Sequence, residues 1–169
     1  IGFRSNYDQI KIKELLNPIT DNLVFMSIES AEMTKHAINS FLATSVTFAN
    51  EIATICEIVG ADAKEVEKGL KTEARIGPKA YLSPGSAFSG GTLARDISFL
   101  SQIANNKDLT VPLIKSISES NSEHKNWVKK RLLKKIENLS KRNIAVWGLT
   151  YKAGTNTLRR SLSVELCNW

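Results

Sequence analysis

Apolar residues recur every three or four positions through residues 28–59, the longest patterned stretch of the chain. The repeat, apolar except for one serine, consists of Ile38, Phe41, Leu42, Ser45, Ala49, Ile52, Ile55 and Ile58. This spacing places the apolar side chains on one helix face. Gly60 then supplies a C-terminal stop. We therefore expect one long helix that begins at Ile28 or Ser30 and ends at Val59.

Shorter periodic stretches predict further helices. The expected ranges are 7–16, 63–70 or slightly beyond, 92–104, 112–122 and, after an irregularity near residue 121, a basic helix ending near 138. Asp62 and Thr92 stand where N-caps are expected, and Pro112 is tolerated in a first turn. An extended stretch follows the first of these helices, at 22–27. Most of the chain is thus predicted to be helical.

The C-terminal part of the sequence changes character. Ile144–Trp147 is a short apolar run that predicts a buried parallel strand, and a helix is expected to begin within 161–169. One strand has no sheet to pair with, so this α/β unit cannot close on itself. The predicted fold is mainly α: a helical domain followed by a short α/β stub.

Composition is that of an ordinary globular domain, with 42% hydrophobic and 24% charged residues. No uninterrupted apolar run approaches the roughly 20 residues of a membrane helix, so we expect no membrane partner. The chain opens without a leader-like segment and without Met, which suggests a fragment. Cys56 and Cys167 have neither disulfide nor metal spacing, which predicts a reducing cytoplasm and no metal site.

The net charge of +6 raises the question of a polyanionic partner. The basic residues concentrate in 125–142, where apolar residues interleave with them at helical spacing. They are interpreted as the solvated face of an amphipathic helix. A nucleic-acid binder is the weakest of the alternatives, because no RNA- or DNA-binding motif accompanies the charge.

Residues 75–96, R-I-G-P-K-A-Y-L-S-P-G-S-A-F-S-G-G-T-L-A-R-D, have the layout of an active-site segment. Gly90 and Gly91 let a backbone approach a ligand closely, and the expected helix start offers unpaired N–H groups. Thr92 and Asp96 are four residues apart and would share a helix face. A surface loop leading into an ordinary helix explains the spacing equally well.

Longer matches point to a family. The 75–96 segment resembles R-I-G-x-x-x-L-x-P-G-x-x-F-G-G-S-C-x-P-K-D, the catalytic loop of the nucleotide-sugar dehydrogenases, the UDP-glucose/GDP-mannose dehydrogenase family. Residues 30–44 are similar to the A-E-M-x-K-x-x-x-N-x-F-L-A-T helix of that family. Residues 50–53 and 59–62 match N-E-I-A and V-G-A-D, and residues 144–161 resemble I-A-V-L-G-L-x-F-K-x-x-T-D-D-x-R-E-S. The matches cover most of the chain in the correct order.

The resemblance implies a division into three parts. Residues 1–27 would connect from a missing Rossmann domain. Residues 28–142 would form a helical dimerisation and substrate-binding domain, similar to the C-terminal domain of 6-phosphogluconate dehydrogenase. Residues 143–169 would begin a C-terminal nucleotide-sugar-binding α/β domain. No GxGxxG occurs in the sequence, so NAD would be bound mainly by the absent domain, and these 169 residues alone should be inactive.

The same resemblance implies partners and a setting. The long helix would pair with its copy in a homodimer, the ligand would be a UDP- or GDP-sugar, and the protein would serve polysaccharide biosynthesis in the cytoplasm. Which nucleotide sugar is bound, which carbon reacts, and whether NAD or NADP is used all stay open.

Roles carry over to matching positions. Lys35 and Asn39 would stabilise developing negative charge and position water, and Asp96 would orient water or accept a proton. Arg75 would reach a sugar hydroxyl of the neighbouring subunit. The other implied substrate contacts are Lys79, Tyr81, Leu82, Phe88, Gly90, Lys152 and Arg159, and Arg95 is the implied cofactor contact.

Each role has a plainer alternative. A Lys–Asn pair four residues apart is usually a solvated helix surface, Asp96 could favour the helix dipole, and Arg75 could be an ordinary surface cation. Cys56 is expected in the core. His36 and His124 are expected to be structural.

Thr92 is the chief departure, because it stands where the resemblance places the catalytic Cys. In the family a first hydride transfer gives an aldehyde, the Cys captures it, and a second transfer gives a thioester that water hydrolyses. A threonine hydroxyl does not ionise near neutrality as a thiol with a pKa of about 8.5 can, and no His is placed as its base. We expect one oxidation only, or reaction at a ring hydroxyl. The alternative is a non-catalytic domain that dimerises and binds nucleotide sugars.

Overall fold

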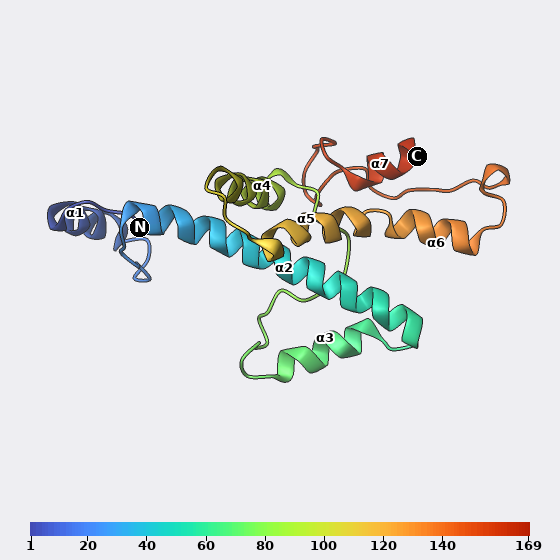
Figure 1. Cartoon of the computed structure of the whole chain (residues 1–169), viewed down its shortest axis with the longest axis horizontal. Helices are drawn as coiled ribbons and strands as arrows, with labels where there is room; N and C mark the ends of the chain where they lie inside the picture. Colours follow the sequence, from blue (N-terminus) through green and yellow to red (C-terminus); the bar gives the residue numbers. More distant parts are fainter. The chain divides into compact units, whose positions relative to one another are not determined.

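The computed structural model describes all 169 residues, and its regular elements are helical (Figure 1). They are α1 (Asn6–Leu16), α2 (Ile28–Val59), α3 (Ala63–Thr72), α4 (Gly91–Asn106), α5 (Pro112–His124), α6 (Trp127–Lys135) and α7 (Leu162–Asn168), with a 3-10 turn at Leu139–Lys141. The chain divides into two compact units, residues 1–39 and 40–169, and the division falls within α2. The mainly α fold predicted from the sequence is confirmed.

The first unit is built around α1. Ser5 caps this helix in a reciprocal arrangement: its hydroxyl accepts from the Asp8 amide at 3.2 Å, and its own amide donates to the Asp8 carboxylate at 3.1 Å. The chain then returns, so that Gly2 and Met26 form an isolated parallel bridge. Phe3 and Phe25 meet edge to face with ring centroids 6.0 Å apart. The predicted helix at 7–16 is confirmed within one residue.

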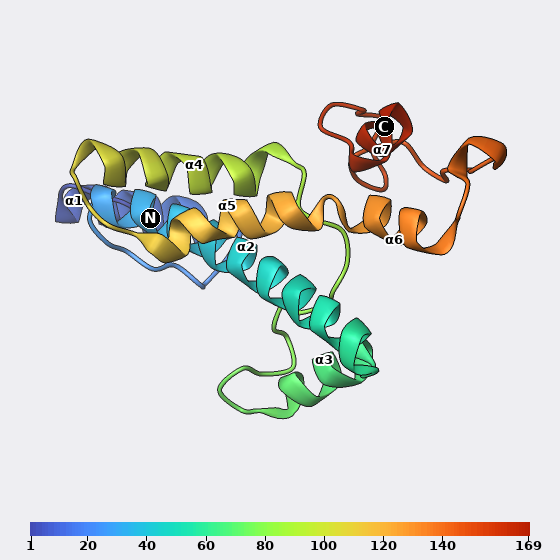
Figure 2. The ribbon, with the colours of Figure 1, turned by 45° about the vertical axis from the view of Figure 1, so that its right-hand side comes forward.

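The core of the second unit lies where α2, α4 and α5 meet. Ala43, Ile97 and Ile117, one from each helix, are buried there, and Phe88, Leu93 and Ile114 pack around them. Helices α4 and α5 pack against each other and run side by side (Figure 2). Ala43 is fully buried in this cluster, so α2 contributes a small side chain to a closely packed core.

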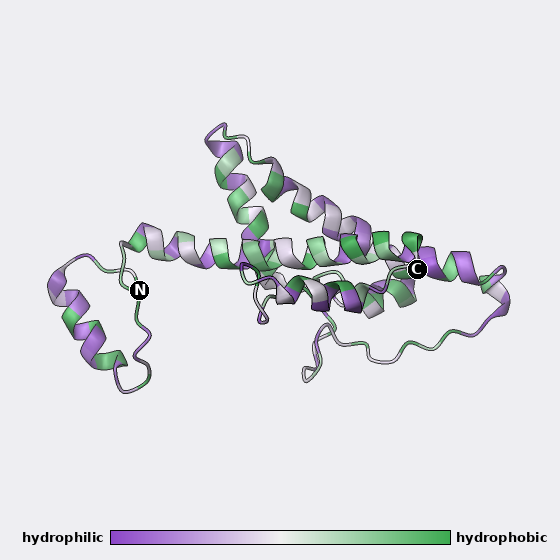
Figure 3. Cartoon of the chain, turned by 90° about the horizontal axis from the view of Figure 1, so that it is seen from below, coloured by the Kyte–Doolittle hydropathy of each residue, from purple (hydrophilic) through white to green (hydrophobic).

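Helix α2 has two kinds of surface. Its buried positions carry short side chains, and the hydroxyls of Ser45 and Thr47 are bonded to carbonyls one turn earlier, at 3.0 and 3.1 Å. Elsewhere apolar side chains face outward: Phe41, Phe48 and Ile55, seven residues apart, are 73%, 45% and 54% exposed. Figure 3 shows apolar positions recurring along this helix.

Helix α2 also bears on the expectation of a chain without a membrane partner. An 18-residue window within it has a mean hydropathy of 1.3, so by length and composition alone it is apolar enough to cross a membrane. The helix nevertheless holds no uninterrupted apolar run of such length, because Ser, Thr and Asn residues are interspersed along it. A core helix of a soluble protein passes the same test, and the buried side chains of Ser45, Thr47 and Asn50 are typical of such a helix.

The helix boundaries bear out most of the sequence predictions. Asp62 caps α3 as expected, accepting from the amides of Lys64 and Glu65 at 2.7 and 3.2 Å. Helix α4 instead has extended Gly90 as its N-cap, so Thr92 lies inside the first turn and does not cap it. The break between α5 and α6 falls after His124, later than predicted, and α6 ends at Lys135.

The predicted strand at Ile144–Trp147 is not formed. These residues pair with no other strand, and Trp147 is 97% exposed. A lone extended segment leaves its backbone groups to water, so it gains nothing from strand geometry. The helix expected after it does form: Ser161, 2% exposed, caps α7 by accepting from the Val164 amide at 3.3 Å.

Candidate functional site

Two buried asparagines fix the inner end of the loop between α3 and α4. Asn50 on α2 accepts from the Gly85 amide at 2.8 Å. Asn121 on α5 accepts from the Phe88 amide and donates to the Phe88 carbonyl, both at 2.9 Å. Because these bonds satisfy backbone groups that no secondary structure pairs, they hold the loop in one place. Neither side chain was given a role from the sequence.

The outer end of the loop is held by charged groups. Glu67 on α3 accepts from Lys71 at 2.6 Å and from the Ser83 hydroxyl at 2.5 Å, and these two bonds hold its pKa below the ordinary value. Arg75 pairs with Glu73 at 2.9 Å, which lowers the pKa of Glu73 and raises that of Arg75. Arg75 is thus an exposed, paired cation within its own chain. Lys79, Tyr81 and Leu82 lie on the same outer part of the loop, where Tyr81 is 63% exposed.

The start of α4 lines a pocket of about 490 Å³. On one side lie the loop end and first turn, and on the other the segment before α7. The residues around it are Phe88, Gly90, Gly91, Thr92, Leu93, Tyr151, Lys152, Thr157, Arg159 and Arg160. The structure therefore brings together five positions predicted from the sequence, namely Phe88, Gly90, Thr92, Lys152 and Arg159. We call this the Thr92 pocket.

The two glycines at the α4 start are close to that later segment. A Cβ added at Gly91 would lie 2.5 Å from Nη1 of Arg160, whereas one at Gly90 would make ordinary contact with the Tyr151 ring at 3.5 Å. The expected approach of a ligand to these glycines stays a prediction. The group that lies close to Gly91 here is the guanidinium of Arg160, a residue given no role from the sequence.

Arg95 does not line the Thr92 pocket, but lies in a neighbouring pocket that Arg160 also lines. Both arginines line a second pocket, of about 620 Å³, together with Gln102 and Ser98 on α4. Asp96 follows Arg95 on α4 and is 1% exposed. Lys35 and Asn39 belong to the first unit, on the early turns of α2, where their four-residue spacing is retained in a continuous helix.

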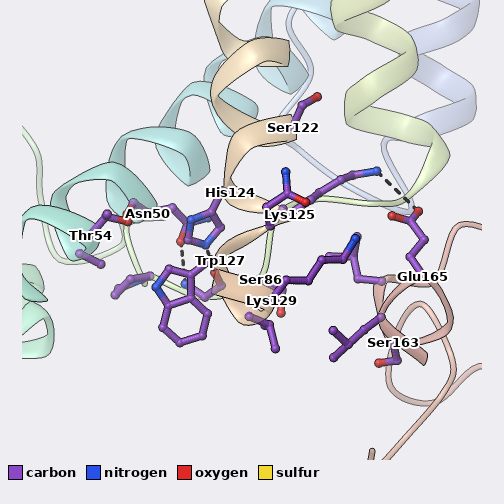
Figure 4. A pocket seen from close by; sticks show the side chains of 18 of the residues that line it. Asn50, Thr54, Ser86, Ser122, His124, Lys125, Trp127, Lys129, Ser163 and Glu165 are labelled. Atoms are coloured by element: carbon purple, nitrogen blue, oxygen red, sulfur yellow. Dashed lines mark hydrogen bonds and ion pairs between the residues drawn. The ribbon is translucent and has the colours of Figure 1, made fainter. Parts of the chain in front are cut away.

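A third pocket, of about 550 Å³, lies between the Asn50 end of the loop and helices α2, α5, α6 and α7 (Figure 4). His124 contacts the Gly85 carbonyl at 2.8 Å and stacks on Trp127, with ring centroids 6.3 Å apart. Lys125 pairs with Glu165 at 3.6 Å. These contacts give His124 the structural role expected of it. Cys56 is buried, as expected for a core position.

The arrangement of these elements is that of a known class. The chain superposes on a UDP-glucose dehydrogenase from Pyrobaculum islandicum with a TM-score of 0.91 at 24% identity, over 99% of this chain and 38% of the other. A UDP-D-ManNAc dehydrogenase from Pyrococcus horikoshii gives 0.84, also at 24% identity, over 99% and 40%. The fold is therefore that of the nucleotide-sugar dehydrogenases.

Sequence comparison is more specific. Residues 29–123 match the model of the UDP-glucose/GDP-mannose dehydrogenase family, central domain. A UDP-glucose 6-dehydrogenase from Rickettsia bellii is 36% identical over 98% of this chain and 39% of its own length. A GDP-mannose 6-dehydrogenase from Azotobacter vinelandii is 37% identical over 85% and 32%. The chain belongs to the UDP-glucose/GDP-mannose dehydrogenase family, and it spans about two-fifths of the length of the Rickettsia relative.

Proposed function

We propose that this chain is part of an NAD-dependent oxidoreductase that acts on a CH–OH group of a UDP- or GDP-sugar held in the Thr92 pocket. The observation that carries the proposal is the convergence on one pocket of the α4 start with Lys152 and Arg159. Two cations beside the N-terminus of a helix favour a diphosphate. Membership of a dehydrogenase family supports the reaction class.

The remaining assigned residues supply the chemistry. Asp96 would take the hydroxyl proton, directly or through water, and Lys35 and Asn39 would stabilise the charge that develops on oxygen. NAD, when bound, accepts the hydride. Arg95 is the residue assigned to that cofactor, since its exposed side chain lines a second pocket that shares Gly90, Gly91 and Arg160 with the Thr92 pocket. The Thr92 hydroxyl lacks the acidity for a covalent acyl intermediate, so the oxidation would end after one hydride transfer.

The protein would act as a cytoplasmic homodimer joined through α2. The exposed Phe41, Phe48 and Ile55 support this, because a stripe repeating every seven residues on a helix suits pairing with another helix. Two cysteines without a disulfide suit a reducing compartment.

A second function has one observation in its favour. Thr92 is exposed and lines the pocket where the resemblance places a Cys, which leaves a binding site without a thiol nucleophile. A non-catalytic protein that dimerises and binds nucleotide sugars would need nothing more.

The deciding experiment incubates the intact protein with NAD and a panel of UDP- and GDP-sugars and reads the products by mass spectrometry. Loss of two hydrogens supports the one-step oxidoreductase. Gain of one oxygen with loss of two hydrogens shows that an acid is formed and contradicts the role given to Thr92. Binding without any mass change supports the non-catalytic alternative. Asp96→Asn serves as the control, because it should abolish turnover.

A further inference from the structure

Arg160 stands between the two pockets at the start of α4. Its side chain lines the Thr92 pocket and also the pocket that contains Arg95. Its Nη1 atom lies over Gly91, where a Cβ would come within 2.5 Å of it. The side chain is exposed and pairs with no carboxylate of the chain. A guanidinium is thus held beside Thr92 with its donors available to a ligand.

The backbone at Arg160 is in an uncommon conformation. Its φ is 61°, in the left-handed region that residues with a Cβ rarely adopt. The next residue, Ser161, is buried and caps α7, and its amide donates to the Leu158 carbonyl at 3.1 Å. The α7 cap therefore fixes the backbone that directs Arg160 toward α4. Backbone strain of this kind is often retained where a side chain must be positioned for a ligand.

The charge of the Thr92 pocket exceeds what a diphosphate needs. Three of its lining residues are cations, Lys152, Arg159 and Arg160, and none is acidic. Lys152 and Arg159 are the cations assigned above to the diphosphate, which leaves Arg160 for a further anionic group. In the pattern that residues 144–161 resemble, R-E-S, the position of Arg160 is acidic, so the charge there is reversed in this chain.

We propose that Arg160 determines specificity by pairing with a carboxylate on the sugar, so that the substrate class is a nucleotide sugar that is already an acid. This inference rests on the proposed function of the same pocket. A guanidinium binds a carboxylate with two parallel hydrogen bonds, which gives both affinity and orientation.

The reaction then matches the absence of a thiol. A carboxylate carbon needs no second oxidation, so a covalent intermediate at Thr92 is not required. A ring CH–OH instead becomes C=O: the hydride passes to NAD⁺, giving NADH, and the hydroxyl proton passes to Asp96 and then to solvent. One alcohol and one NAD⁺ are consumed for each ketone, NADH and proton formed.

The test compares neutral and acidic ligands on the intact protein by titration calorimetry. UDP-glucose is paired with UDP-glucuronate, and GDP-mannose with GDP-mannuronate, because the base is not fixed. We expect the acid of the preferred series to bind about 10-fold to 100-fold more tightly, the usual size of a charge-assisted pair. In Arg160→Gln this preference should disappear, while affinity for the neutral sugar changes less than about threefold. Arg160→Lys should retain part of it.

Arg142→Gln is the matched control, because Arg142 is equally exposed and lines neither pocket. It should behave as the wild type, and thermal melting should show that all variants fold. Equal binding of acid and neutral sugar by the wild type, or an equal loss for both in Arg160→Gln, overturns the role of Arg160 and leaves the proposed function standing. If the wild type binds none of the four ligands, both fail together.

Discussion

At the scale of single residues, the site depends on amides that touch no reacting group. Asn121 spans both backbone groups of Phe88, and Asn50 holds Gly85, so two side chains on two helices set the path of the loop. Residues 50–53 match the N-E-I-A pattern of the family, but the match does not explain why an asparagine stands at residue 50. The structure supplies that reason: a buried loop backbone needs partners, and an amide can both accept and donate.

Removing Asn121 should destabilise the protein. In Asn121→Ala the amide and carbonyl of Phe88 lose their partners, and leaving two such groups unsatisfied costs about 2–6 kcal/mol. Urea denaturation of the intact protein measures the change in the free energy of unfolding. Ser122→Ala, at the neighbouring exposed position, should change it by less than about 0.5 kcal/mol. Equal effects of the two substitutions would contradict the anchoring role.

Gly91→Ala should change ligand affinity without lowering the stability of the fold. The new methyl group would displace the Arg160 guanidinium, which is the mobile end of a long side chain, so folding should suffer little. Alanine is the better helix former by up to about 1 kcal/mol, so the melting temperature should stay level or rise. Affinity for the acidic nucleotide sugar should fall nonetheless, because the displaced guanidinium no longer faces the carboxylate.

Gly69→Ala provides the comparison for Gly91→Ala. Gly69 lies within α3, and an added Cβ there meets nothing within 4 Å. This substitution should raise the melting temperature and leave binding unchanged, as calorimetry on the same preparations would show. A loss of affinity in Gly69→Ala of the size seen in Gly91→Ala would mean that the Arg160 contact is not responsible.

At the scale of elements, the helices could be predicted from the sequence, but some of their first and last residues could not. Helix α2 begins at Ile28, one of the two predicted starts, and ends at Val59, before Gly60, as predicted. Asp62 marked the start of α3. The start of α4 was misplaced because Thr92 is a better N-cap by residue type than Gly90. There, the extended path of Gly90 decides which residue precedes the helix. Arg160 escaped prediction because its approach to Gly91 joins segments far apart in the sequence.

Helix α2 should join two copies of the protein. Phe48→Glu places a charge in the middle of the exposed stripe, where a partner helix would have to bury it. We expect the wild type to be dimeric in sedimentation or light scattering at several concentrations, and Phe48→Glu to be monomeric. Leu109→Glu, at an exposed apolar position outside α2, should leave the dimer intact. A monomeric wild type would contradict the pairing.

The contact between α3 and the loop should depend on pH. The pKa of Glu67 lies below its ordinary value of 4.5, because Lys71 and Ser83 donate to the carboxylate. A lowered pKa in the folded state means that the stabilisation is complete above pH 4.5 and is lost as the pH falls through the lowered pKa. Glu67→Gln should therefore melt below the wild type at pH 7, and the difference should shrink as the pH is lowered from 4.5 through the lowered pKa. A gap that stays constant with pH would exclude ionisation as the cause.

At the scale of the whole molecule, the sequence indicated the family more securely than it indicated the local contacts. Motifs in the correct order sufficed for the family and for the mainly α fold, and the comparisons bear out both. Residues 144–147 show that a local apolar pattern alone does not predict whether a strand forms. Its apolar run has strand character, yet a strand exists only with a partner, and Trp147 remains in solvent.

The hydrogen bonds that hold the loop between α3 and α4 affect which substitutions such a protein can accept during evolution. Asn50 and Asn121 bind backbone atoms of Gly85 and Phe88, which every amino acid except proline could supply. Loop side chains other than the buried Ala87 and the packed Phe88 can therefore be exchanged without releasing either attachment. Ligand preference can drift by substitution within a loop whose course stays constant, and the helices that hold it need not change at all.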